Sequence, residues 1–502
     1  MEIEELQERY FAARQKGIDK KRSFVTICCV VLFIISLFPR LLYNNNVLNQ
    51  FAKLPHEDQP EMGDLRRQIA QIGKERSVGY LTPDSPDYLE PAAKLLKGSF
   101  AEAISVKRPV GYPAFLSLTK LQPTAILTAQ AILLTLIPVC TFLLALLLTQ
   151  NVALSFAAGL ISCLSPTGIA LGALVLADGL FSALFAISFV FLFHGALCRS
   201  FLSVLLSAIF TGLAVMVKPM LLFWPLISVF IYSLIAGSQE LLQGGLRDKV
   251  HAWLQVHTRL WRHVTVLLFI PLFFITSWAA LNYWRNGVFT FSNIGALTMR
   301  EYLAVQIEGS EIAGKGLNNE AMFQRQIAIR KRFRDIPTEE EKLRTYKSES
   351  MLVFRKHPLR SVQVMMENGL ANYMAGWNSF GVQLPYSQQE FLKNVSIWEY
   401  RMHKLVFLPM IVAPIIGFII MKIRPSHQNG RLAISLFAMT LTFLFFFVCS
   451  GITFWTGPRI IYPAEFVLIS SMAILLVTVA RTTKALMLSL RVASRTAWQK
   501  RS

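Results

Sequence analysis

The residues best suited to chemistry lie in one segment of the chain, residues 82–113, with the sequence TPDSPDYLEPAAKLLKGSFAEAISVKRPVGYP. Acidic side chains gather near its start, tyrosines lie further along, and a basic pair, Lys107 and Arg108, comes near its end. A carboxylate can accept a proton near neutral pH, and guanidinium groups hold phosphate oxygens through paired hydrogen bonds. Because nearly all the remaining chain is apolar, this segment indicates reaction chemistry at a membrane surface.

The composition is that of a membrane protein. Hydrophobic residues make up 54% of the 502-residue chain and charged residues only 16%. Several apolar runs approach or exceed the roughly 20 residues that cross a hydrocarbon core. These runs are spread from one end of the chain to the other, and backbone groups in lipid must pair internally. We therefore expect an all-α polytopic membrane protein.

The charge and the cysteines exclude several classes of function. In a soluble protein a net charge of +20 would suggest a nucleic-acid partner, but here the basic residues fall in loops between apolar runs. Such loops are typical of the cytoplasmic side of a membrane protein, so we expect no nucleic-acid partner. The six cysteines lie within or beside apolar runs without a CxxC motif, which indicates neither a disulfide framework nor a zinc site.

The alternation of apolar and polar stretches divides the chain into parts with different environments. Lys and Arg dominate the parts assigned to the cytoplasm, whereas the two long polar parts mix acids with bases. In chain order we expect a cytoplasmic segment at 1–23, a first transmembrane helix at 24–43, a first external loop at 44–122, a transmembrane block at 123–284, a second external region at 285–403, C-terminal transmembrane helices at 404–480 and a basic cytoplasmic tail at 481–502.

The apolar runs predict about ten crossings. An even number places both termini inside and both long polar regions outside. Residues 237–263 are then a basic cytoplasmic loop. Glu367, Asn368 and Asn372 interrupt the apolar stretch 362–377, so we expect an interfacial helix there rather than a further crossing. The expected crossings are 24–43, 123–149, 152–174, 178–197, 201–217, 220–236, 264–284, 404–422, 431–454 and 461–480.

Several ionisable side chains fall at the outer ends of the expected helices. A charge at such a depth is costly, so these groups are expected to face a cavity and to pair. Snorkelling to the interface is the alternative for the long basic side chains, but the short Asp178 cannot reach far. Taken together, these ionisable side chains predict a site that binds a lipid-linked phosphate. Asp87, at a helix start, is expected to be solvated. The set is Asp84, Arg108, Asp178, Lys218, Arg285 and Arg459, with Glu465 slightly deeper.

Two neighbouring stretches of the opening segment resemble a known family. DSPDYLEPAAKLL followed by KRPVGYPAFLSL resembles the first external loop of the integral-membrane C-type glycosyltransferases. These include bacterial relatives of protein O-mannosyltransferases and of the lipid A aminoarabinose transferase. Asp84 and Tyr88 match the family's Asp and Tyr four residues apart. Arg108 and Tyr112 match its Arg-Pro-Pro-Gly-Tyr-Pro motif, in which Val110 here replaces a proline.

Three later stretches extend the resemblance over most of the chain. GLAVMVKPMLLFWPL is similar to a family segment in which arginine is common at the place of Lys218. SWAALNYWRNGVFTFSNIGALTMREYL, which contains Arg285, is similar to a second family segment. GPRIIYPAEFVLI, which contains Arg459, is similar to the family's closing span. The order of these stretches and their placement at external helix ends match the family.

The resemblance implies an inverting glycosyltransferase that takes its sugar from a polyprenyl phosphate or pyrophosphate in the outer leaflet. It implies a multi-pass protein of the bacterial inner membrane, with the site facing outward and a lipid, glycan or protein as acceptor. Asp84 matches the family's catalytic acid, which implies a general base, and Asp178 resembles a second external acid. The other implied roles are donor-phosphate binding by Arg108, Lys218, Arg285 and Arg459, and substrate positioning by Tyr88 and Tyr112.

The sequence leaves some roles open. No cofactor is implied. Ser85 stands where some members of the family have a second acid. A divalent metal is therefore possible but not indicated. For Tyr88 and Tyr112 a role as interfacial aromatics is an equal alternative. The histidines form no metal-binding spacing.

Two other functions compete with the glycosyltransferase. A transporter or flippase for lipid-linked glycans would show internal repeats and helices broken at mid-membrane, whereas no two-half repeat is evident and the charges lie at the outer face. An O-antigen ligase or polymerase is also polytopic with a large external loop, but an acidic loop with tyrosines directly after the first crossing is not expected of it.

Overall fold

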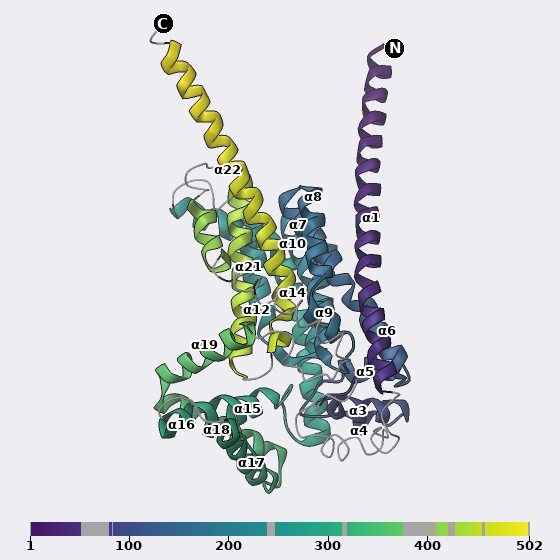
Figure 1. Ribbon diagram of the computed structural model, residues 1–502, viewed down its shortest axis with the longest axis vertical. Helices are drawn as coiled ribbons and strands as arrows, with labels where there is room; N and C mark the ends of the chain where they lie inside the picture. The colour runs from purple at the N-terminus through teal and green to yellow at the C-terminus, as the bar shows by residue number, and fades with distance from the viewer. Residues whose placement is uncertain are drawn as a thin grey trace.

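The computed structural model describes residues 2–51, 80–82, 84–237, 246–313, 319–374, 401, 407, 409–419, 427–453 and 457–499. This part of the chain is built from helices (Figure 1), which confirms the expectation of an all-α membrane protein. Much of the expected first external loop (52–79 and 83), residues 375–400, and the flanks of the expected crossing 404–422 lie outside the described residues.

The helices follow one another closely along the chain. The first half holds α1 (Glu2–Phe51), α3 (Pro86–Leu96), α4 (Phe100–Ala103), α5 (Gly111–Leu118), α6 (Pro123–Leu134), α7 (Leu136–Thr149), α8 (Val152–Cys163), α9 (Pro166–Leu171), α10 (Ala177–Cys198), α11 (Phe201–Val217), η2 (Pro219–Leu221) and α12 (Trp224–Ala236). The second half holds α14 (Leu246–Asn286), α15 (Ile294–Thr298), η3 (Met299–Ala304), α16 (Val305–Ala313), α17 (Asn319–Arg334), α18 (Glu339–Lys356), α19 (Pro358–Met374), α21 (His427–Gly451), η5 (Gly457–Ile460), η6 (Tyr462–Ala464) and α22 (Glu465–Gln499).

Six described stretches are long and apolar enough to cross a membrane. They are Arg22–Asn49, Pro123–Thr149, Ala177–Cys198, Leu260–Asn286, Gly430–Gly451 and Tyr462–Arg481. Four shorter apolar helices overlap the remaining expected crossings and are Val152–Cys163, Phe201–Val217, Trp224–Ala236 and Pro409–Ile419. The last four fall below the roughly 20 residues of a full crossing, so the total of ten stays a prediction.

Three helices continue well past their apolar stretches. The expected loop at 237–263 is helical from Leu246, because α14 runs unbroken from there to Asn286. Likewise α1 begins at Glu2, and α22 reaches Gln499. From Leu246 up to Pro271, and in α22 from Glu465 onward, the sequence holds no proline or glycine, so nothing in it stops a helix where the apolar run gives way to basic residues.

The two ends of the chain lie at the same end of the molecule, as Figure 1 shows. The helices of the two polar regions, α3 and α4 from the first and α15 to α18 from the second, lie at the opposite end. An even number of crossings produces this arrangement.

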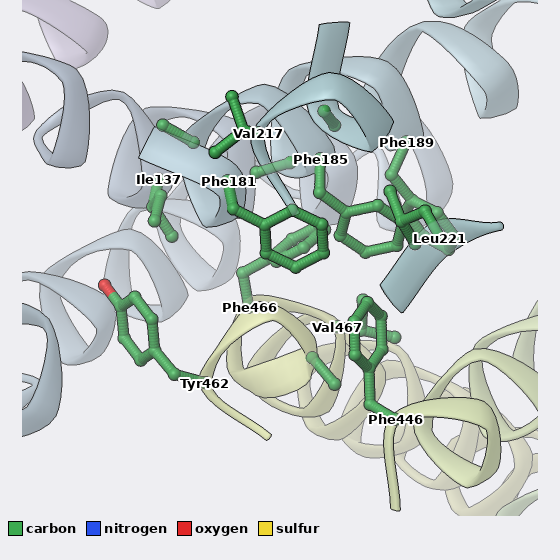
Figure 2. Close-up of a cluster of buried hydrophobic side chains, with 14 of the residues drawn as sticks. Ile137, Phe181, Phe185, Phe189, Val217, Leu221, Phe446, Tyr462, Phe466 and Val467 are labelled. Carbon is green, nitrogen blue, oxygen red and sulfur yellow. The ribbon is translucent and has the colours of Figure 1, made fainter. Parts of the chain in front are cut away.

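The centre of the helix bundle is packed with aromatic rings around α10. Phe181, Phe185, Phe189 and Phe193 follow at intervals of four residues, which places them on one face of the helix, and each is at most 1% exposed. The ring of Phe185 lies 4.9 Å from that of Phe446 on α21 and 5.0 Å from that of Trp224 on α12. Figure 2 shows how these rings fill the space between α10, α21 and α22.

The second polar region is joined to the first by backbone contacts. The amide of Asn293 donates to the carbonyl of Val106 at 2.7 Å, and the Ser292 hydroxyl donates to the carbonyl of Lys107 at 2.7 Å. Because residues 292 and 293 immediately precede α15, these bonds fix the α15–α18 region beside the segment that ends in Lys107 and Arg108.

Helix α19 shows why the apolar stretch 362–377 carries amides. The side chain of Asn372 donates to the carbonyl of Ser450 at 3.0 Å, and that of Asn368 donates to the carbonyl of Gly451 at 3.2 Å. Both carbonyls lie at the end of α21, where the regular helical pairing stops, and the carbonyl of Ser450 also accepts from the amide of Thr453 at 3.1 Å. The amides therefore clamp α19 onto α21, while the expected location of α19 at the membrane interface stays a prediction.

Candidate functional site

The loop that carries Asp84 is held against the start of α10 by a hydrogen-bonded clasp. The hydroxyl of Ser85, fully buried, accepts from the amide of Thr82 at 2.8 Å and donates to the carbonyl of Val175 at 2.9 Å. The amide of Val175 in turn donates to the carbonyl of Tyr80 at 2.8 Å. Because α10 begins two residues after Val175, the clasp fixes Asp84 relative to Asp178.

Asp84 lies between two arginines from distant parts of the chain. Its Oδ2 accepts a hydrogen bond from Nη1 of Arg459 at 3.1 Å, and its Oδ1 lies 3.4 Å from Nη2 of Arg108. The carboxylate side chain is 33% exposed, whereas Arg108 and Arg459 are 11% and 23% exposed. The arrangement presents an accessible carboxylate in front of two largely enclosed cations.

The surroundings of Asp84 control its protonation. Partial burial alone would raise the pKa of the Asp84 carboxyl, but the positive charges of Arg459, Arg108 and Lys107 outweigh that effect. The pKa of Asp84 is therefore held well below its usual range, so the group is an anion at neutral pH. As an anion it can accept a proton, but the neighbouring cations make it a weak base.

Asp87 belongs to the same cluster, so the expectation that it is a solvated residue at a helix start is wrong. Its carboxylate is only 13% exposed, lies 2.6 Å from Nζ of Lys107 and 3.6 Å from Nη2 of Arg108. The reason is the turn that follows α4, which brings Lys107 and Arg108 back over the first turn of α3. The acids at the start of the segment and the bases at its end thereby pair.

Tyr88 and Tyr112 are buried inside the protein at 2% and 0% exposure. Their rings meet edge to face at 4.9 Å, and the guanidinium of Arg108 lies 5.0 Å from the centre of the Tyr88 ring. The Tyr112 hydroxyl donates to Oε1 of Gln130 at 2.5 Å, and Nε2 of Gln130 donates to the carbonyl of Leu174 at 2.9 Å. Tyr88 thus supports Arg108. Through Gln130, Tyr112 ties α5 to α6 and to residues 172–176, the strap that precedes α10.

A second ion pair lies next to the first. Nζ of Lys218, at the end of α11, contacts Oδ1 of Asp178 at 2.5 Å, and the two side chains are 14% and 4% exposed. Asp178 lies in the first turn of α10, where the helix dipole favours a carboxylate. Asp178 is also within electrostatic reach of Arg108 and Arg459, so the two ion pairs form one cluster.

Gly111 permits the close contact that joins the two halves of this cluster. A Cβ atom at Gly111 would lie 2.5 Å from the backbone oxygen of Met216, near the end of α11. No other residue type allows α5 to approach α11 so closely. The contact holds Arg108, three residues before Gly111, beside Lys218, two residues after Met216.

The cluster has an excess of positive charge. Its carboxylates are Asp84, Asp87 and Asp178, and its cations are Lys107, Arg108, Lys218 and Arg459. In addition, Nε of Arg108 is buried without a hydrogen-bond partner among the described residues. A buried donor without a partner is costly, so the site is suited to an incoming anion that accepts from it.

Two predicted residues lie apart from the cluster. Arg285 is exposed, and its Nε donates to the carbonyl of Ala101 at 3.1 Å, so the structure brings it to the first polar region but not to the acids. Glu465 accepts from the hydroxyl of Ser165 at 2.9 Å, at the start of the short helix α9.

Three residues of the site were not expected. Ser85 and Gln130 organise its backbone, and Tyr302 on η3 lies within electrostatic reach of Asp84 and accepts from Nη2 of Arg330 at 3.2 Å. A buried glutamine within a crossing was a signal for Gln130, since polar groups there pair inside the protein. No pattern in the sequence pointed to Tyr302, because a tyrosine in a mixed polar region is common.

Within the described part of the chain, no group of three or more His, Cys, Asp or Glu side chains is arranged to hold a metal ion. Comparison of the chain with protein families, with curated proteins and with solved structures found no match.

Proposed function

We propose that the protein is an inverting glycosyltransferase that moves a sugar from a polyprenyl-phosphate donor to an acceptor at the outer face of the membrane. The observation that carries the proposal is the position of Asp84, an accessible carboxylate in front of two largely enclosed arginines at one end of a helix bundle. A base and a phosphate site side by side are the two groups that such a transfer requires. The resemblance of the surrounding motifs to C-type glycosyltransferases supports the same assignment.

The residues have complementary roles in the proposed reaction. The acceptor hydroxyl or amine attacks the anomeric carbon, its proton passes to the Asp84 carboxylate, and the bond from the anomeric carbon to the phosphate oxygen breaks. The lipid phosphate leaves with the bonding electrons and is stabilised by Arg108 and Arg459. Lys218, paired with Asp178, adds positive charge behind them, and Arg285 contributes to substrate binding from the edge of the site.

The pairing of Asp84 suggests how the donor activates the base. In the structure the arginines hold the pKa of Asp84 well below its usual range, which makes it a weak proton acceptor. A donor phosphate that binds Arg108 and Arg459 competes with Asp84 for their charge. Binding of the donor therefore raises the pKa of Asp84, so the base becomes stronger only when there is a sugar to transfer.

The packing beneath the site favours an enzyme over a transporter. Phe181 lies one turn below Asp178, and Nζ of Lys218 is 5.7 Å from the centre of its ring. From there Phe185, Phe189 and Phe193 continue along α10, each at most 1% exposed. A flippase needs a route for a polar headgroup through this region, whereas a transferase needs access from one face only.

Sugar transfer by the purified protein in nanodiscs tests the proposal. With a polyprenyl-phosphate sugar as donor, we expect Asp84→Asn to lower turnover by about 10²–10⁴-fold, because the amide cannot accept a proton. Donor binding should persist, since the amide leaves no isolated buried anion. Glu102→Gln, which removes an exposed acid from α4, is the matched control and should retain full turnover.

The outcomes distinguish between roles for Asp84. If Asp84→Asn turns over at close to the wild-type rate, Asp84 is not the general base. Equal losses of donor binding and turnover make Asp84 a donor-positioning residue instead. If no polyprenyl-linked sugar is transferred by the wild-type protein to a lipid, glycan or protein acceptor, the glycosyltransferase assignment itself is wrong.

A further inference from the structure

Arg40 in the first crossing is a buried cation with no carboxylate partner among the described residues. Its side chain is 0% exposed, and its Nη1 donates to the carbonyl and the hydroxyl of Ser36 at 2.7 and 2.5 Å. Its Nε and Nη2 have no hydrogen-bond partner in the described part of the chain. These two nitrogens form one edge of the planar guanidinium, the edge that binds two oxygens of an oxyanion side by side. Both donors on this edge of Arg40 are therefore free to bind an oxyanion.

Two neighbours of Arg40 have vacant polar atoms as well. The hydroxyl of Tyr43 and the Oδ1 atom of Asn44 are both buried without a hydrogen-bond partner from the residues that the structure describes. Nδ2 of Asn44 donates to the carbonyl of Leu127 on α6 at 2.8 Å. Tyr43 and Asn44 follow Arg40 by about one helical turn on the face of α1 that packs against the bundle. Buried polar groups are normally paired, so this concentration of unpaired atoms at one end of a crossing suits a polar ligand.

The depth of Arg40 suits a lipid phosphate. Arg40 follows Arg22, the first residue of this crossing, by 18 positions. At 1.5 Å per residue the separation is about 27 Å, close to the ~30 Å thickness of a hydrocarbon core. Arg22 at one boundary therefore places Arg40 at the other, where the phosphates of the opposite leaflet lie. The predicted topology makes that leaflet the outer one.

A lipid has a short path to this guanidinium. On the side of α1 turned away from the bundle, Phe38, Leu41 and Leu42 are 65%, 38% and 50% exposed, as expected of a face that contacts lipid. Only 22% of the most apolar window of this crossing is buried, so α1 packs on the bundle through a narrow face. A headgroup beside α1 reaches Arg40 when the outer end of α1 leans away from α6.

We propose that Arg40, with Tyr43 and Asn44, forms a phosphate-binding site for a lipid of the outer leaflet, between the outer ends of α1 and α6. The site is separate from the Asp84 cluster, because the short helix α9 packs between α1 and η5, the element that carries Arg459. The proposal rests on the unpaired edge of Arg40 and does not depend on glycosyl transfer.

Native mass spectrometry of the full-length protein released from nanodiscs tests the site. The probes are phosphatidylglycerol, a polyprenyl phosphate and inorganic phosphate, with a diglucosyl diacylglycerol as a lipid that lacks phosphate. We expect Arg40→Gln to bind the preferred phosphate probe about tenfold or more weakly than the wild-type protein, because the paired donors are lost. The probe that shows the difference identifies whether the source is a bilayer lipid, a polyprenyl carrier or a free ion.

Two further variants complete the experiment. Arg40→Lys keeps the charge but lacks the planar edge, so its affinity should lie between those of the wild-type protein and Arg40→Gln. Lys120→Gln removes an exposed cation from the turn before α6 and should bind the probes as the wild-type protein does.

The proposal is overturned if folded Arg40→Gln binds every phosphate probe as tightly as the wild-type protein. If Arg40→Gln cannot be purified in folded form, Arg40→Lys is the deciding variant. Wild-type affinity in Arg40→Lys overturns the proposed binding of phosphate by the Nε and Nη2 edge of Arg40. A wild-type protein that binds the phosphate-free glycolipid as well as it binds all three phosphate probes overturns the site directly.

Discussion

Asp84 and Arg108 show how one ion pair can serve two purposes at the scale of single residues. In the resting protein the pair keeps both groups charged and in place at the membrane surface. In the proposed reaction the same arginine binds the donor phosphate, and the carboxylate is released to accept a proton. The unpartnered Nε of Arg108 means that binding can begin before the pair with Asp84 is broken.

Substitution of Arg108 should weaken donor binding. Charge-assisted hydrogen bonds contribute about 1.5–3 kcal/mol, so Arg108→Ala should raise the donor Kd by roughly 10–100-fold. Arg108→Lys should recover only part of this loss, because an ammonium cannot bind two phosphate oxygens in one plane. Calorimetric titration with a polyprenyl-phosphate donor measures both, and Lys97→Ala, an exposed cation on the same segment, is the control. Wild-type affinity in Arg108→Ala would leave Arg108 a purely structural residue.

The protonation of Asp84 gives a prediction about pH. Its pKa in the folded protein is lowered, so its contribution to stability is fully present above the unfolded value of about 3.9. That contribution is lost only as the pH falls through the lower folded value. Infrared difference spectra between the wild-type protein and Asp84→Asn should therefore still show an ionised carboxylate at about pH 4. A carboxyl that titrates near its usual value in the folded protein would contradict the arrangement with Arg108 and Arg459.

At the scale of elements, the position of the site depends on close contacts between helices that are distant in sequence. Gly111 at the start of α5 touches the backbone of α11, and Gln130 in α6 binds the strap that precedes α10. These contacts hold the segments that carry Arg108, Lys218 and Asp178 against one another. In the proposed function, side chains at the contacts therefore affect donor binding without contacting the substrate.

Gly111→Ala should disturb the site through its backbone. The added Cβ would lie 2.5 Å from the backbone oxygen of Met216, so α5 must move away from α11. Overpacking of this kind typically costs about 1–3 kcal/mol, and it separates Arg108 from Lys218. We expect a lower thermal unfolding midpoint together with weaker donor binding. Gly295→Ala, where nothing lies within 4 Å of the added atom, is the control. Full donor affinity in Gly111→Ala would show that the contact does not position the cations.

Helix positions were largely predictable from the sequence, whereas helix ends and contacts were not. The expected crossings at 178–197 and 201–217 agree with α10 and α11 within a residue, because apolar runs and the polar residues between them mark both ends. The expected loop at 237–263 was wrong, since hydropathy marks the part of a helix that lies in lipid and not where the helix stops. Leu246–Asn286 continues as a helix because its basic residues are good helix formers.

The site was predictable in its charges but not in its pairings. Asp84, Arg108, Asp178, Lys218 and Arg459 were singled out because each is an ionisable group at a helix end, and the structure brings all five together. Which acid meets which base depends on how the chain turns between helices. A list of crossings does not contain that information, and the location of Asp87 and the separation of Arg285 from the acids were missed for this reason.

At the scale of the whole molecule, the structure separates two kinds of surface. The ends of α1 and α22 project from one end of the bundle, and the ion-pair cluster and the α15–α18 region lie toward the other (Figure 1). The basic residues near both chain ends favour the cytoplasm for the first end. The cluster then faces outward, where the donor and acceptor are expected.

Cysteine labelling of intact cells tests this orientation. Lys342→Cys, on α18, should react with an impermeant maleimide, whereas Arg495→Cys, near the end of α22, should react only after the cells are opened. The physical reason is that basic ends are retained on the cytoplasmic side. Labelling of Arg495→Cys but not Lys342→Cys from outside would invert the proposed orientation, and labelling of both from outside would require an even number of crossings between the two positions.

The phenylalanine column of α10 has a consequence for the cell as an electrical system. A protein with charged groups near one face of an energised membrane must not let ions follow those charges to the other face. In the described part of the bundle, Phe181, Phe185, Phe189 and Phe193 are at most 1% exposed and interlock with rings from α12, α21 and α22. If the cluster faces outward, as proposed, these rings would insulate it from the opposite side, so that ions could not follow its charges across the membrane potential.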